Sequence, residues 1–174
     1  VQSDKIDEAS GIASSKNNKN LVWVHNDSGD LSKIYAIRLD GSHLGVLRLS
    51  GILPRDWEDM CIGPGPEDNT DYLYIADIGD NFSRKNKKRI HRVKEPIINL
   101  DSLSLPFNIR IQDFETIVFK YPDGNWDAEA LMIDPLTKDL FILTKRESSV
   151  HFYRLAYPQS ISSVITAQKL GNLT

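Results

Sequence analysis

The chain has 174 residues, of which 40% are hydrophobic and 26% are charged, with a formal net charge of -3 and a sequence pI of about 5.8. This acidic balance argues against a binder of nucleic acid or of an anionic membrane surface, because both need a basic surface. No apolar segment reaches the about 20 residues that span a bilayer, and the single cysteine, Cys61, excludes an internal disulfide.

The first copy of a repeated pattern occupies roughly residues 6–52. It begins with Glu8, which is followed by small residues and a short apolar stretch. After a polar loop, aromatic and β-branched residues predict a second strand. Alternation of apolar with other residues predicts a third strand, and a more weakly patterned fourth strand closes the copy. The predicted strands of this copy are residues 7–13, 21–25, 34–37 and 45–49.

Two further copies follow, at roughly residues 53–124 and 125–174, and Glu58 and Glu129 align with Glu8. An insertion at about residues 97–113, rich in Pro, Asn and Asp, explains the greater length of the second copy and predicts a loop, with or without a short extra strand. No segment has sustained helical periodicity. The predicted strands are residues 57–63, 72–76, 90–93 and 116–121, and then 128–134, 139–143, 152–155 and 165–170.

Four antiparallel strands in a repeated unit predict an all-β fold of the β-propeller type, with three four-stranded blades in one partial domain over residues 1–174. A β-sandwich is the alternative, but it does not explain why the same order of Glu, strand, polar turn and strand recurs. Propellers have about four to eight blades, so we expect half of a six-bladed ring. A second chain cut from the same precursor, or a second copy of this chain, would supply the rest, and the precursor is favoured.

Polar residues at the strand ends should converge on the mouth of the propeller channel. In each copy of the repeat, the start of the first strand lies there, beside the turn that follows the second strand. Crowded carboxylates need protons, cations or basic neighbours, and their hard oxygen atoms suit Ca²⁺ better than zinc. The predicted metal ligands are Glu8, Asn26, Asp27, Glu58, Asp77, Asn81 and Glu129.

Further side chains at this end are candidates for ligand binding or catalysis. Lys145 and Arg146 either neutralise the acidic ring or bind an anionic ligand. Trp57 and Asp127 are candidate ligand contacts, although a tryptophan at such a position more often packs in a core, and the repeated Glu could instead bond to backbone amides. His25 and Asp80 are the candidate general bases. His25 would need to point into the channel mouth, whereas strand alternation could equally turn it into the blade.

Four blocks of the sequence, residues 25–30, 56–60, 76–81 and 127–131, resemble a family of six-bladed, TolB-like propeller proteins. The resemblance implies a six-bladed propeller of which this chain is the first half, and it carries no settled activity. Six-bladed propellers in general include calcium-dependent lactonases, phosphotriesterases and phytases, which is an analogy of fold alone.

We expect a secreted binding module whose calcium site recognises a small or extended ligand. The alternative is a calcium-dependent hydrolase of the lactonase, esterase or phosphoesterase type, and a third possibility is a structural scaffold. The start at Val1 predicts a processed chain. Sequons for N-glycosylation at Asn26, Asn81 and Asn172 are compatible with secretion, and Asn172 is the preferred glycan site.

Overall fold

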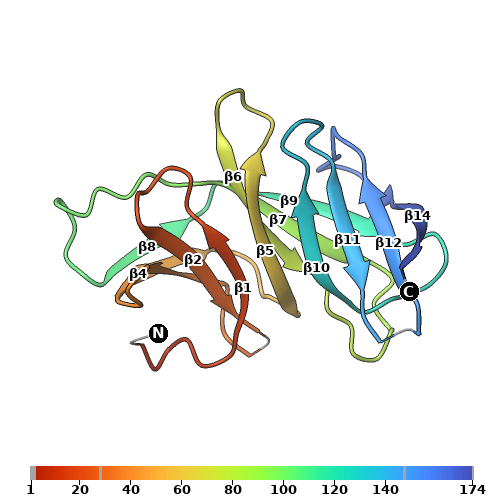
Figure 1. Ribbon diagram of the computed structural model, residues 1–174, viewed down its shortest axis with the longest axis horizontal. Coiled ribbons are helices and arrows are strands. Elements are labelled where there is room, and N and C mark those ends of the chain that lie inside the picture. Colours follow the sequence, from red (N-terminus) through yellow and green to blue (C-terminus); the bar gives the residue numbers. More distant parts are fainter. Residues whose placement is uncertain (1–2, 28, 147, 174) are drawn as a thin grey trace.

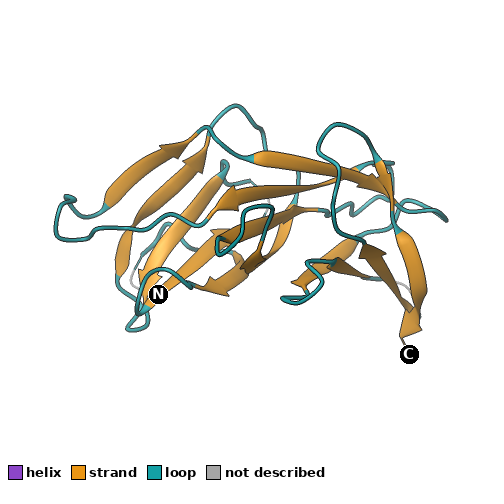
Figure 2. Ribbon diagram, turned by 90° about the horizontal axis from the view of Figure 1, so that it is seen from above, coloured by secondary structure: helices purple, strands orange, loops and turns teal. Residues whose placement is uncertain are grey.

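The computed structural model describes residues 3–27, 29–146 and 148–173. Within these ranges the chain is all-β, with no helix, and its strands form three sheets (Figure 1 and Figure 2). No helix capable of crossing a membrane therefore occurs in the described part. The predicted all-β class is confirmed, and most strands have bounds close to those expected from the sequence.

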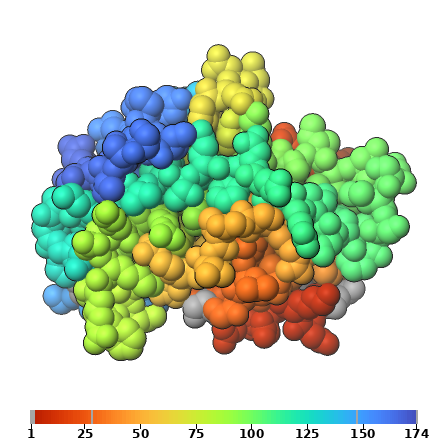
Figure 3. Space-filling model, turned by 180° about the vertical axis from the view of Figure 1, so that it is seen from behind, coloured from red at the N-terminus to blue at the C-terminus, as the bar shows by residue number. Residues whose placement is uncertain are grey.

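The first sheet is a meander of four antiparallel strands joined by a fifth. Strand β8 comes from the predicted insertion and adds to β4 in parallel, so the insertion forms a strand in the sheet of the preceding copy. Figure 3 shows the insertion, in green, against the outer side of the first sheet. In order across the sheet the strands are β1 (Ala9–Ser14), β2 (Leu21–Asn26), β3 (Lys33–Arg38), β4 (His43–Leu49) and β8 (Phe107–Ile111).

The second sheet is also a four-stranded antiparallel meander with one added strand. The short strand β13 pairs with β9 in parallel, at the edge of the sheet. In order across the sheet the strands are β5 (Trp57–Pro64), β6 (Asp71–Asp77), β7 (Lys88–Lys94), β9 (Glu115–Lys120) and β13 (Ile165–Thr166).

The third sheet consists of β10 (Ala128–Ile133), β11 (Leu140–Thr144), β12 (Val150–Leu155) and β14 (Gln168–Leu173). The prediction of one continuous strand over residues 165–170 was wrong. The segment divides at Ala167, whose N–H donates to the carbonyl oxygen of Lys120 at 2.9 Å. Residues 165–167 thereby pair with backbone groups at the edge of β9 that would otherwise be unpaired. Only the residues after Ala167 form β14 and complete the third sheet.

The three first strands lie side by side, with β5 between β1 and β10 (Figure 1). Two apolar layers separate the sheets. Trp23, Leu47 and Leu73 are buried in the layer between the first and second sheets, and Tyr74 and Tyr153 are buried in the layer between the second and third. Each such side chain contributes about 1.5 to 3 kcal/mol through burial, so the layers hold the first strands in fixed relation to one another.

Among the described residues, no sheet packs on the far face of the third sheet. Met132 on β10 is 43% exposed, and Phe141 and Phe152 stack on this face with ring centres 5.5 Å apart. The three sheets therefore do not close into a ring by themselves.

Candidate metal centre

The pairing of first with second strands defines equivalent positions in the three sheets. Asn26, Asp77 and Thr144 are equivalent, because each pairs with the residue that begins β1, β5 or β10. The pairs are Ala9 with Asn26, Trp57 with Asp77, and Ala128 with Thr144.

The same register overturns the predicted equivalence of Glu8 with Glu58 and Glu129. Glu8 directly precedes the first strand, so its counterparts are Asp56 and Asp127. Backbone bonds agree, since the carbonyl oxygen of Glu8 accepts from the next loop at 2.8 Å and that of Asp127 does so at 2.9 Å. Alignment by acidic residue failed because the later copies carry two acidic residues here, two positions apart.

Each first strand contains a β-bulge at the same place. The register shifts between residues 9 and 11, 57 and 59, and 128 and 130. The middle residues are Ser10, Glu58 and Glu129, and a bulge leaves such a residue outside the regular ladder and redirects its side chain. In the first sheet the Ser10 hydroxyl donates to the carbonyl oxygen of Glu58 at 2.5 Å, which ties β1 to β5.

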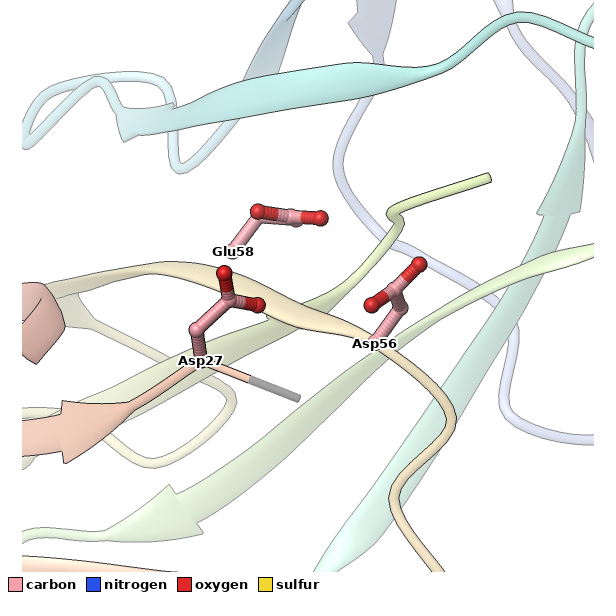
Figure 4. Close-up of side chains that lie close together, drawn as sticks. All are labelled: Asp27, Asp56 and Glu58. Carbon is pink, nitrogen blue, oxygen red and sulfur yellow. The ribbon is translucent and has the colours of Figure 1, made fainter. Parts of the chain in front are cut away.

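Five carboxylates meet at this corner, in two groups that share Glu58. Asp27 and Asp56 form the first group with Glu58, and Asp127 and Glu129 form the second with it. In each group, one carboxylate oxygen from every member lies within 4.8 Å of the others. Figure 4 shows the first group, in which Asp27 follows β2, Asp56 precedes β5 and Glu58 lies on β5.

Glu58 is the central side chain of the cluster. It is only 6% exposed, and its carboxylate has no hydrogen-bond or ion-pair partner among the described residues. Burial, followed by the charges of Glu129 and Asp27, raises the pKa of Glu58 to about 8. A side chain at Gly79 would collide with the carboxylates of Glu58 and Asp56, so glycine provides the space they occupy. Without a counter-ion, Glu58 therefore retains its proton at neutral pH.

Cationic side chains neutralise part of the cluster. Lys145 Nζ lies 2.5 Å from Glu129 Oε1, and Arg146 Nε lies 2.6 Å from Asp127 Oδ2. Lys85 Nζ is further from its carboxylate, at 3.4 Å from Asp56 Oδ2. Lys145 and Arg146 thus act as counter-ions in this structure, which is one of the two roles expected for them.

Among the described residues, the carboxylates of the cluster outnumber the cationic side chains that contact it. Within the described part of the chain, five carboxylates form it and three cationic side chains contact it. Full ionisation therefore leaves an excess of two negative charges. The arrangement can hold a metal ion, since carboxylate oxygens from separate segments face a common space.

Two predicted ligands, Glu8 and Asn26, border a different cavity. Glu8 is exposed and does not belong to either carboxylate group. The Asn26 amide donates to the carbonyl oxygen of Lys5 at 2.8 Å and to Asp30 Oδ2 at 3.3 Å. Both residues line a cavity of about 530 Å³ beside the first sheet, so they do not add to the Glu58 cluster.

Asp77 and Asn81 support the cluster indirectly. Asp77 is 2% exposed, and its Oδ1 accepts from the backbone N–H of Arg55 and, at 2.8 Å, of Asp56. It thereby positions Asp56, which was not among the predicted ligands. Asn81 Oδ1 accepts from the Arg146 guanidinium. An acidic residue immediately before the strand was the sequence signal that could have identified Asp56.

The two candidate bases are buried away from solvent. His25 is 0% exposed, its Nδ1 lies 2.8 Å from the carbonyl oxygen of Asn26, and its ring meets Trp57 edge-on at 5.5 Å. Burial lowers the pKa of His25. Asp80 is 2% exposed and lies 2.9 Å from Lys88 Nζ. Trp57 itself is buried between the first two sheets. His25 therefore points into the packed interior beside Trp57, which corresponds to the second of its expected orientations.

The sequons differ in their setting. Ser28 and Thr174, which complete the sequons at Asn26 and Asn172, lie outside the described residues. Asn26 is buried, whereas Asn81 and Asn172 are exposed.

Comparison with known proteins identifies no relative of this chain. No family model matches the sequence, and no curated protein and no solved structure is significantly similar to it. The residues of the Glu58 cluster themselves are therefore what points to a function.

Proposed function

We propose that the chain is a calcium-binding recognition module of a β-propeller, in which Ca²⁺ bound by Asp27, Asp56 and Glu58 contacts a ligand. The observation that carries the proposal is Glu58, a buried carboxylate without a partner in the described structure, which is aimed at two other carboxylates. A buried anion without a partner is costly, and a bound cation would remove this cost.

The donor set favours calcium over transition metals. The two groups contain only carboxylate oxygens, without His or Cys. Ca²⁺ takes about six to eight oxygen ligands in flexible geometry, whereas zinc prefers nitrogen and sulfur in a tetrahedral site. The excess of two negative charges matches one divalent ion.

The proposed ion would use its remaining coordination positions for ligand oxygens. Three protein carboxylates do not fill the coordination shell of Ca²⁺. A ligand with hydroxyl, carboxylate or phosphate oxygens could complete it, whether it is a small molecule or an extended chain. We propose an extracellular site, where weak calcium modules function.

The propeller itself is the second part of the proposal. Three meanders whose first strands lie side by side, and whose faces pack through two apolar layers, support blades around a common axis. The exposed face with Met132, Phe141 and Phe152 is where the next blade would pack. A second chain cut from a shared precursor, or a second copy of this chain, would supply the remaining blades of a six-bladed ring.

Calorimetric titration with CaCl₂, together with native mass spectrometry, tests the proposal. We expect one Ca²⁺ per chain, lost on chelation, and a loss of at least tenfold in affinity for Glu58→Gln. The matched control is Glu67→Gln, which removes the same charge from an exposed loop residue paired with Lys94. Unchanged calcium binding by Glu58→Gln would contradict the assignment. A wild-type monomer without a further chain or copy would contradict the half-propeller.

The hydrolase alternative lacks an observation of its own. A general base must reach the reacting group, and neither His25 nor Asp80 is exposed to a bound substrate. A purely structural scaffold would give no reason to keep a costly unpaired carboxylate at Glu58. The binding module is therefore favoured over both.

A further inference from the structure

We propose that Lys145 and Arg146 act as built-in cations that restrict the acidic cluster to a single metal ion. The inference rests on the proposed function, and it concerns stoichiometry. Two groups of three carboxylates are available, and both are compact enough to hold an ion. Glu58 belongs to both, so the question is why the cluster should not bind two ions.

The two groups differ in how their carboxylates are already satisfied. Asp127 uses both oxygens, since Oδ1 accepts from the backbone N–H of Asp80 at 2.6 Å and Oδ2 pairs with Arg146 at 2.6 Å. Glu129 pairs with Lys145 at 2.5 Å. In the first group, the lysine that reaches Asp56 does so only at 3.4 Å. Protein cations therefore contact the second group more closely than they contact Asp56 in the first group, so we expect the metal ion in the first group.

The repeat shows how this difference arises. Asn26 and Thr144 are equivalent, so the residues that follow them, Asp27 and Lys145, are equivalent too. The backbone N–H of each donates to the residue before the first strand, at 2.8 Å and 2.9 Å. One position of the repeat therefore carries a metal-ligating carboxylate in the first sheet and an ammonium in the third.

Lys145 and Arg146 lie where they would exclude a metal ion from the second group, and their own side chains remain partly exposed. The side chains of Lys145 and Arg146 are 43% and 49% exposed, whereas that of Asp127 is 3% exposed. They therefore lie over the second group from the solvent side. A metal ion there would have to displace both cations and bear their repulsion.

Neutralising both cations should create a second metal site. The test variant is Lys145→Gln with Arg146→Gln, and the readout is the number of Ca²⁺ ions bound per chain in calorimetry and native mass spectrometry. We expect one ion for the wild type and two for the variant. Lys94→Gln with Arg110→Gln makes the same change of net charge at exposed residues outside the cluster, and it should still bind one ion.

The outcomes separate this inference from the proposed function. One ion in both the wild type and the folded variant would overturn the inference and leave the proposed function standing. Two ions in the wild type would also overturn it. No ion in the wild type would refute the proposed function and the inference with it. If the double variant does not fold, as judged by circular dichroism, Lys145→Gln alone is used, and it should show a second, weaker ion. A single ion in that variant would overturn the inference.

Discussion

Replacing Glu58 by Gln should remove a specific pH dependence from the stability of the metal-free protein. The pKa of Glu58 is raised from its ordinary value of 4.5 to about 8, chiefly by burial. In the unfolded chain the carboxyl loses its proton near pH 4.5, whereas in the folded chain it keeps the proton until about pH 8. The free energy of unfolding therefore falls as pH rises through this interval, and it is constant with respect to Glu58 above it.

The size of the effect follows from the same interval. A separation of about 3.5 pH units corresponds to a ceiling of about 5 kcal/mol. The neighbouring side chains of Glu129, Lys145 and Arg146 are partly exposed, and screening by water reduces the expected value to about 1 to 3 kcal/mol. Glutamine keeps the shape of the protonated carboxyl without the charge, so the variant should match the wild type near pH 5 and exceed its stability by this amount at pH 9.

Urea unfolding in a chelator, followed by tryptophan fluorescence at pH 5, 7 and 9, measures the difference between the two proteins. Taking the difference cancels the titration of groups common to both. Glu67→Gln, at an exposed position, should follow the wild type at every pH. Equal pH dependence in Glu58→Gln and wild type would refute the reasoning, because it would mean that the carboxyl is not destabilised by the folded structure.

Two further substitutions test buried polar contacts, one beside the cluster and one within the layer between the first two sheets. Asp80→Asn removes the anion beside Lys88, whose side chain is 1% exposed. Because this leaves a buried charge unpaired, we expect chemical unfolding to show a free energy of unfolding lower by about 3 to 5 kcal/mol. A decrease below about 1 kcal/mol would contradict the pairing. Trp23→Phe removes the indole N–H that donates to Glu95 Oε1 at 2.8 Å. We expect the same assay to show a free energy of unfolding lower by about 1 to 3 kcal/mol. Unchanged stability would show that other donors to Glu95 compensate.

Local patterns were sufficient to predict the strands and part of the site. Aromatic and β-branched residues around Trp23 and Tyr74 mark strands, because such side chains favour extended backbone, and the structure buries both faces of these strands. The polar turns after the second strands placed Asp27 near the acidic corner. Glu58 and Glu129 were likewise identified from their place at the start of a strand.

Tertiary structure decided which edges pair and which carboxylates meet. Ile165 and Thr166 have strand character, but only the free edge of β9 determines that they join the second sheet. Glu8 resembles Glu58 in sequence context, yet the register of β1 against β2 places it outside the cluster. The physical reason is the distance along the chain over which the interactions act. Strand propensity depends on neighbouring side chains. Strand register, bulges and the meeting of Asp27, Asp56 and Glu58 depend instead on hydrogen bonds and packing between segments that are far apart in the chain.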